Sequence, residues 1–197
     1  GKTWAPRGQT PKIKVTGIPT HEKFSRSYDI GTLKEKLGLK KDAFTVLVAT
    51  GSFGIGPIEE IMLRLKDFQV LVVCGHNKNL YAKLSPQAKG DAKVFGLVDN
   101  MPELMAVSDV MVTKPGGLSI SEALVSHLPM IFFNAIPGQE TNNIKVLKTY
   151  GIGLSNLTID EIVEALNKFK SSKDLFLTAV KKTKELAHPY AVNEILA

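Results

Sequence analysis

The sequence has little of several residue types, and each shortage excludes a class of protein. Cys74 is the only cysteine among 197 residues, which excludes a disulfide framework and a cysteine-rich zinc site. No apolar run approaches the roughly 18 residues that a membrane span needs. The first ten residues, GKTWAPRGQT, contain no apolar core of a signal peptide. We therefore expect a globular protein of a reducing, cytoplasmic compartment.

Arginine is also scarce. Of the 25 cationic residues 22 are lysine, and only Arg7, Arg26 and Arg64 are arginine, within a net charge of +6. Arginine is the preferred bidentate reader of bases, so the composition argues against nucleic acid as a partner. The lysine excess suits a phosphate-bearing ligand or an anionic lipid surface, and general solubility is the plain alternative. The four histidines are dispersed, so we expect no metal site.

Apolar runs and helical patterns alternate along most of the chain. Because the runs are continuously apolar, they are typical of strands that are buried on both faces. The alternation predicts an α/β fold, a doubly wound Rossmann-like parallel sheet of about six strands. We expect residues 1–30 to be an arm or linker and residues 31–197 to be the domain. The six runs are Phe44–Ala49, Val70–Cys74, Lys93–Phe95, Val110–Thr113, Met130–Phe133 and Ile152–Leu154.

Ligands of such sheets bind beyond the carboxyl ends of the strands, and a glycine-rich loop follows the first run there. This loop contains Gly51, Ser52, Phe53 and Gly54. Glycines let backbone N–H groups approach a phosphate or a sugar closely. The spacing matches neither the dinucleotide fingerprint nor the P-loop. A tight turn that uses the freedom of glycine explains the loop equally well.

The loop after the fourth run is the most informative segment. Gly116 and Gly117 directly precede an expected helix, whose free N–H groups and dipole favour a diphosphate. Lys114 adds a positive charge nearby, and Ser119 adds a hydroxyl. Glu122 can accept hydrogen bonds from ribose hydroxyls, as acidic residues do in nucleotide sites. Alternatively, Ser119 and Glu122 have the spacing of a capping box.

Two further loops offer polar groups. The segment 134–143 supplies paired planar groups that sugar hydroxyls need, from Gln139, Glu140, Asn142 and Asn143. A polar loop before a capped helix is the alternative. The segment 95–100 ends a strand and can present backbone N–H and C=O groups to a planar base.

Four segments together resemble one family. They read Gly-Ser-Phe-Gly at 51–54, Phe-Gly-Leu-Val-Asp-Asn-Met at 95–101, Thr-Lys-Pro-Gly-Gly-Leu-Ser-Ile-Ser-Glu-Ala-Leu at 113–124 and Pro-Gly-Gln-Glu at 137–140. They resemble the C-terminal, nucleotide-sugar-binding half of GT-B glycosyltransferases. Within that fold, the sequence is most similar to the diacylglycerol glucosyltransferase and monogalactosyldiacylglycerol synthase group. The resemblance covers roughly residues 12 to 190.

The resemblance assigns the candidate residues to one donor site. Gly51 to Gly54 would face the donor phosphates, and Leu97 and Val98 would hold the uracil ring through backbone atoms. Gly116, Gly117, Leu118 and Ser119 would bind the diphosphate, and Glu122 the ribose hydroxyls. The donor sugar would contact Gln139 and Glu140, with Asn142 or Asn143 nearby.

The activity that the resemblance implies is transfer of a hexose from UDP-glucose or UDP-galactose to diacylglycerol, with inversion and without a cofactor or metal. The acceptor site and the catalytic base would lie in an N-terminal domain for which this chain has no room. We therefore expect the chain alone to bind the donor but to turn nothing over, and the whole enzyme to sit peripherally on an anionic membrane surface.

Two alternatives stay open. One is another GT-B activity, either a lipid-linked N-acetylglucosaminyl transferase or a UDP-N-acetylglucosamine 2-epimerase. The other is a non-catalytic nucleotide-binding module.

Overall fold

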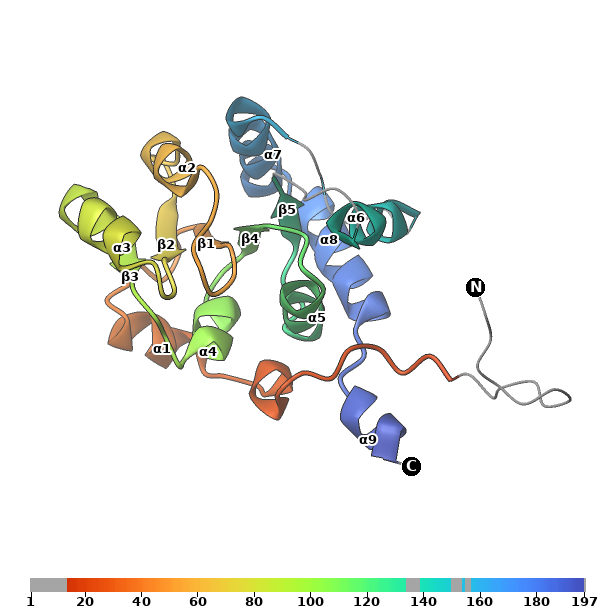
Figure 1. Ribbon diagram of the computed structural model, residues 1–197. Coiled ribbons are helices and arrows are strands. Elements are labelled where there is room, and N and C mark those ends of the chain that lie inside the picture. The colour runs from red at the N-terminus through yellow and green to blue at the C-terminus, as the bar shows by residue number, and fades with distance from the viewer. Residues whose placement is uncertain (1–13, 134–138, 150–153, 155–156, 197) are drawn as a thin grey trace, which may run out of the picture.

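Strands and helices alternate along the computed structural model, which describes residues 14–133, 139–149, 154 and 157–196, with the backbone alone at 139–141, 146 and 148. The strands are β1 (Thr45–Ala49), β2 (Gln69–Val73), β3 (Ala92–Phe95), β4 (Val110–Thr113) and β5 (Met130–Phe132). The α-helices are α1 (Ile30–Lys36), α2 (Ile58–Arg64), α3 (Lys78–Leu84), α4 (Met101–Ala106), α5 (Gly117–Val125), α6 (Gln139–Thr149), α7 (Ile159–Ser171), α8 (Lys173–Leu186) and α9 (Ala191–Leu196). Two short 3-10 helices, η1 (Glu22–Ser25) and η2 (Ser85–Gln87), complete the described elements (Figure 1).

The strands form a single parallel sheet with the order β3-β2-β1-β4-β5. The central strand β1 is buried at every position and pairs with β2 on one side and β4 on the other. The parallel sheet predicted from the apolar runs is thus confirmed. The sixth expected run lies largely outside the described residues, but Leu154 forms a parallel bridge with Ile131 of β5.

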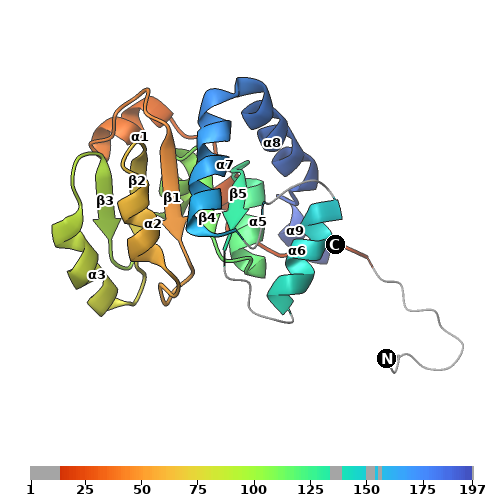
Figure 2. The ribbon, with the colours of Figure 1, turned by 90° about the horizontal axis from the view of Figure 1, so that it is seen from above.

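Helices cover both faces of the sheet, because alternate strand residues point to opposite sides. Val46 and Val48 face a core cluster that includes side chains of α2 and α7. Leu47 and Ala49 face a second cluster with α4 and α5. Figures 1 and 2 show the resulting three layers, with the sheet between the two sets of helices.

The segment before the first helix runs along the second helical layer. Helix η1 contacts α4 and α5, and the Ser126 hydroxyl donates a hydrogen bond of 3.2 Å to the carbonyl of Phe24. Further upstream, Lys14 forms an ion pair with Glu194 of α9 at 3.4 Å. The amino-terminal segment and the last helix therefore lie side by side, on the right of Figure 1.

The strand order places a switch point between β1 and β4. The chain proceeds from β1 to β2 and β3 on one side, then returns to β4 on the other side of β1. In open α/β sheets, the loops that leave the two strands at such a point diverge and create the ligand crevice. These loops are residues 50–56 after β1 and residues 114–116 after β4.

Candidate functional site

The amino end of α5 has no side-chain cap. The N-cap residue is Gly116, with φ −72° and ψ 135° and no side-chain hydrogen bond to the helix start. The first intrahelical bond runs from the Ile120 N–H to the Gly116 carbonyl at 2.9 Å. The N–H groups of the first helical turn, at residues 117–119, therefore have no partner within the described chain. An uncapped helix start of this kind can bind an anion.

The capping box considered for Ser119 and Glu122 does not form. Helix α5 begins at Gly117, so Ser119 is already its third residue rather than its N-cap. The hydroxyl of Ser121 donates instead to the Gly117 carbonyl at 3.0 Å. Glu122 is consequently not occupied by capping the helix.

Glu122 is a desolvated carboxyl group. Its side chain is half-buried on α5, and burial raises its pKa from 4.5 to about 7. It makes no hydrogen bond or ion pair with any other described residue. An unpaired carboxylate in a desolvated place is costly, so Glu122 is a candidate to accept hydrogen bonds from a ligand.

The described residues leave the space beside the helix start open. A Cβ atom added to Gly116 would meet no atom of the described residues within 4 Å, whereas one added to Gly117 would lie 3.2 Å from Ile18 Cδ1. Asn143 of α6 donates from Nδ2 to the Pro115 carbonyl at 2.9 Å, which fixes the strand-to-helix turn. Lys114, half-buried in that turn, has no acidic partner among the described residues.

The glycine-rich loop after β1 is exposed at the same edge of the sheet. Gly51 and Gly54 have positive φ values of 79° and 53°, a conformation that side chains disfavour. Ser52 and Phe53 between them are exposed, and their N–H groups make no hydrogen bond within the described chain. The loop thus offers backbone donors to a ligand.

The remaining predicted residues lie around this core. Leu97 is 64% exposed and Val98 packs on the second core cluster, both after β3. Two strands separate β3 from β4, so the ends of these strands are on the order of 14 Å apart. Asn142 is exposed on α6. The side chains of Gln139 and Glu140, like residues 134–138, lie outside the described part.

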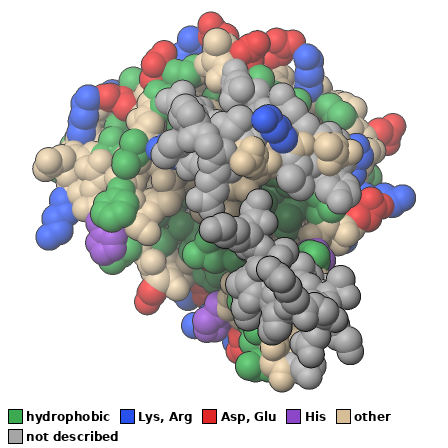
Figure 3. Space-filling model, turned by 45° about the vertical axis from the view of Figure 1, so that its right-hand side comes forward, with side chains coloured by type: hydrophobic (Ala, Val, Ile, Leu, Met, Phe, Trp, Pro, Cys, Tyr) green, Lys and Arg blue, Asp and Glu red, His purple; other side chains and the backbone are tan. Residues whose placement is uncertain are grey.

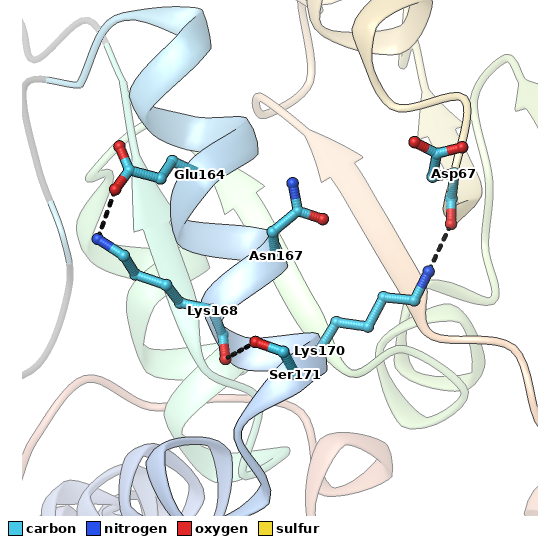
Figure 4. Close-up of a pocket in the computed structure, with 6 residues that line it drawn as sticks. All are labelled: Asp67, Glu164, Asn167, Lys168, Lys170 and Ser171. Atoms are coloured by element: carbon cyan, nitrogen blue, oxygen red, sulfur yellow. Dashed lines mark hydrogen bonds and ion pairs between the residues drawn. The ribbon is translucent and has the colours of Figure 1, made fainter.

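A shallow hollow of about 800 Å³ occurs elsewhere, between α7 and the segment before β2 (Figure 4). Asp67 precedes β2, so this hollow is at the amino edge of the sheet, opposite the candidate loops. Its cations already have partners. Lys168 pairs with Glu164 at 2.6 Å, and Lys170 donates to the Asp67 carbonyl at 2.8 Å. Its charges compensate one another, so it is a poor candidate for the functional site.

Two general features of the described residues bear on function. They contain no helix long and apolar enough to cross a membrane, and no group of three or more His, Cys, Asp or Glu arranged to hold a metal ion. On the face shown in Figure 3, cationic and acidic side chains lie interspersed around the rim rather than in separate fields.

Comparison with known proteins decides the family. The profile of the glycosyltransferase family 28 C-terminal domain matches residues 45–194, which include the whole described sheet and all candidate loops. The chain belongs to this family.

Curated relatives of this family 28 domain are named as processive diacylglycerol beta-glucosyltransferases. The protein from Staphylococcus carnosus (strain TM300) is 34% identical over 185 residues, which are 90% of this chain and 47% of the relative. The protein from Bacillus subtilis (strain 168) is 31% identical over 181 residues, 88% of this chain and 47% of the relative. The chain thus spans about half the length of these relatives.

Solved structures show that the family 28 domain shares its fold with GT-B glycosyltransferases. MurG of Acinetobacter baumannii matches 97% of this chain and 57% of its own, with a TM-score of 0.69 and 17% identity. HepE of Anabaena, crystallised with UDP-glucose, matches 90% of this chain and 55% of its own, with a TM-score of 0.66 and 14% identity. At such low identities, the likeness establishes the fold alone.

Sequence reasoning missed three residues of the family 28 domain at this edge. The hydroxyls of Thr50 and Thr113, at the ends of β1 and β4, are buried without a hydrogen-bond partner among the described residues. A buried hydroxyl group without a hydrogen-bond partner destabilises the fold, and such groups are expected near functional regions. Asn77 holds the glycine-rich loop through its amide group. Two signals in the sequence point to Asn77, namely its place in the loop after β2 and its position three residues before Leu80, which is typical of a helix N-cap.

Proposed function

We propose that this chain is the donor-binding half of an inverting glycosyltransferase that moves a hexose from UDP-glucose or UDP-galactose to diacylglycerol. The carrying observation is the uncapped start of α5 beside open space at Gly116, with the desolvated, unpaired Glu122 in the same helix. Family membership and the names of the relatives support the reaction class.

In this proposal, the free N–H groups at 117–119 bind the diphosphate of the donor. Breaking the bond from the anomeric carbon leaves negative charge on UDP. N–H groups that are already fixed at a helix start stabilise this charge without reorganisation, and the dipole of α5 and the Lys114 ammonium act in the same direction. The N–H groups of the glycine-rich loop reach the donor from the β1 side.

The nucleoside and the sugar occupy the flanking positions. The Glu122 carboxylate accepts hydrogen bonds from the ribose hydroxyls, and the backbone at Leu97 and Val98 holds the uracil ring. A nucleotide is long enough to bridge from α5 toward this segment. The residues of α6 from Gln139 to Asn143 contact the hexose, with Asn143 also fixing the turn at Pro115.

The other half of the reaction lies outside this chain in the proposal. Residues 1–30 are a linker from a preceding domain that carries the acceptor site and the catalytic base, and residues 31–197 are the donor domain. The assembled enzyme is peripheral on the cytoplasmic, anionic membrane surface, where the lysine excess assists its association.

Isothermal titration calorimetry with four donors tests the proposal. We expect UDP-glucose or UDP-galactose to bind more tightly than UDP-N-acetylglucosamine, with ADP-glucose the weakest because its base differs. Glu122→Gln should weaken binding about tenfold, since it replaces one of the two acceptor oxygens with an NH2 donor and removes the charge. The exposed Glu35→Gln on α1 provides the matched control. Preference for UDP-N-acetylglucosamine would favour the N-acetylglucosaminyl transferase or epimerase alternative, and oligonucleotide binding without UDP competition would favour a non-catalytic module.

A further inference from the structure

The turn between β2 and α3, residues 74–77, is bound to the glycine-rich loop by two hydrogen bonds. The His76 N–H donates to the Ser52 carbonyl at 2.7 Å, and Asn77 Nδ2 donates to the Gly54 carbonyl at 3.3 Å. The two segments lie 20 or more residues apart in sequence but side by side in space (Figure 1). Both acceptors in the loop are backbone carbonyls.

The contact is too close for side chains. A Cβ atom on Gly75 would lie 2.3 Å from the Ser52 carbonyl oxygen, and a Cβ atom on Gly54 would lie 2.5 Å from the Cys74 carbonyl oxygen. Both glycines also have positive φ, 59° and 53°. Each glycine is therefore required by the backbone of the opposite segment, and the two backbones fit against each other with no space to shift.

Anchoring the carbonyls also orients the loop N–H groups. The described peptide bonds are all trans, and in a trans peptide the C=O and the following N–H point in opposite directions. With the carbonyls of Ser52 and Gly54 bound to the turn, the N–H groups of Phe53 and Ile55 point away from it. Neither N–H has a partner within the described chain.

Asn77 has a second role that must be separated from this one. Its Oδ1 accepts a hydrogen bond from the Leu80 N–H at 2.9 Å and so caps α3. A residue that only capped α3 would stabilise the fold without affecting the loop. The two roles use different atoms of the same amide group, so substitution can distinguish them.

We propose that Asn77 and Gly75 are positioning residues, which fix the peptide groups of the glycine-rich loop so that the Phe53 and Ile55 N–H groups face the bound donor. This inference rests on the proposed function, because it takes UDP-glucose as the ligand. It assigns to the β2–α3 turn a role in donor affinity that acts through the glycine-rich loop.

Asn77→Ser is the decisive variant. Serine is also a good N-cap, so α3 keeps its cap, but the donor to Gly54 is lost. Asn79→Ser, at an exposed position of α3, is the matched control.

The readouts are the Kd of UDP-glucose by calorimetry, the Tm, and the NMR order parameters of the Phe53 and Ile55 amides. We expect a Kd about tenfold higher in Asn77→Ser and order parameters that fall from about 0.85 toward 0.6. The Tm should fall by no more than a few degrees, because one hydrogen bond is lost while the cap is kept, and Asn79→Ser should match the wild type.

The outcomes separate the inference from the proposed function. Wild-type affinity and order parameters in Asn77→Ser would overturn the inference, as would a loss of affinity that only follows a loss of Tm. If the wild type does not bind UDP-glucose but Asn77→Ser loosens the loop, the proposed function fails and the positioning of the loop stands. Gly75→Ala provides an independent check, because its Cβ must displace the Ser52 carbonyl; unchanged loop amide chemical shifts in this variant would contradict the close contact.

Discussion

At the residue scale, the carboxylate of Glu122 destabilises the fold, and in the proposed complex it accepts hydrogen bonds from the ligand. Its carboxyl group is half-buried without a described partner, and burial raises its pKa to about 7. Below this pH the group is protonated and loses its capacity as a full acceptor for ribose hydroxyls. We expect the Kd of UDP-glucose, whose diphosphate does not titrate in this range, to rise about tenfold between pH 8 and pH 6, since about nine-tenths of the Glu122 groups are protonated one unit below the pKa. Calorimetry at several pH values measures this, and in Glu122→Gln the dependence should disappear. A pH-independent Kd in the wild type would contradict the role of Glu122.

The Glu122 carboxyl group should also make the stability of the fold depend on pH, in the opposite direction to the donor affinity. Its folded-state pKa of about 7 is above the ordinary value of 4.5, so the folded protein binds more protons than the unfolded chain between these values. The free energy of unfolding therefore decreases as the pH rises from 4.5 to 7. We expect Glu122→Gln to raise the stability at pH 8 by on the order of 1–2 kcal/mol, after allowance for partial exposure, and to leave it nearly unchanged at pH 4. Urea unfolding at both pH values measures the difference. Equal effects at pH 4 and pH 8 would show that the carboxylate is not destabilising.

Gly116 allows the open space at the site to be filled directly. Its φ of −72° suits any residue, and an added Cβ would meet no atom of the described residues within 4 Å. Gly116→Ala should therefore fold, with a Tm lowered by no more than a few degrees because alanine is a poorer N-cap than glycine. In the proposed complex the added methyl group occupies the approach to the helix N–H groups, so we expect UDP to bind at least tenfold more weakly. Equal affinity, measured by calorimetry, would mean that the diphosphate does not bind at this end of α5.

At the element scale, the two ends of α5 differ in how they are capped. The amino end is left uncapped, whereas the carboxyl end is closed by bonds from the Leu128 N–H to the Ala123 carbonyl and from the His127 N–H to the Leu124 carbonyl, at 2.8 Å and 3.0 Å. This is a Schellman motif. In this motif His127 adopts a φ of 58°, a left-handed conformation that glycine adopts more easily. We expect His127→Gly to stabilise the fold by about 0.5–1 kcal/mol, measured by urea unfolding, with no change in the Kd of UDP. Weaker UDP binding in this variant would show that the two ends of α5 are coupled.

Four of the described strands could be predicted because they are buried along their length and read as nearly continuous apolar runs between polar loops. The edge strand β3 is only half-buried and contains Lys93, so its pattern is weaker. The helix starts could be predicted only in part. The pattern Thr/Ser-x-x-Glu occurs at Thr158 and at Ser119, but the capping box forms only at Thr158. The difference arises because Gly116 and Gly117 let the chain enter the helix earlier, and spacing alone does not show where the backbone turns.

The loops of the candidate site could be predicted from the sequence, but the contacts between them and their burial could not. The carboxyl ends of parallel strands meet at one edge of the sheet, which brings together the loops after β1 and β4. The contact from Asn77 to Gly54 joins residues far apart in sequence, and the raised pKa of Glu122 depends on the burial of its surroundings. Neither follows from local pattern, since both depend on how α3 and α5 pack on the finished sheet.

At the scale of the whole molecule, the chain spans about half the length of its curated relatives. Its own two core clusters bury both faces of the sheet, so we expect the chain to fold without the other half. Binding to the folded form alone raises stability by about 2.7 kcal/mol at a ligand concentration one hundred times the Kd. For a domain of this size, that corresponds to a rise in Tm of roughly 5–10 °C.

This separation of binding from turnover gives the last prediction. With UDP-glucose and vesicles that contain diacylglycerol, the chain should show the rise in Tm but form no glucolipid, because the proposed acceptor site and base lie in the other half. Transfer of radiolabelled glucose into the lipid extract measures turnover, and ADP-glucose is the control for the rise in Tm. Labelled lipid from this chain alone would contradict the division of labour, since the residues described here would then have to activate the acceptor. A Tm unaffected by UDP-glucose would instead contradict the donor site at the start of α5, whatever the turnover.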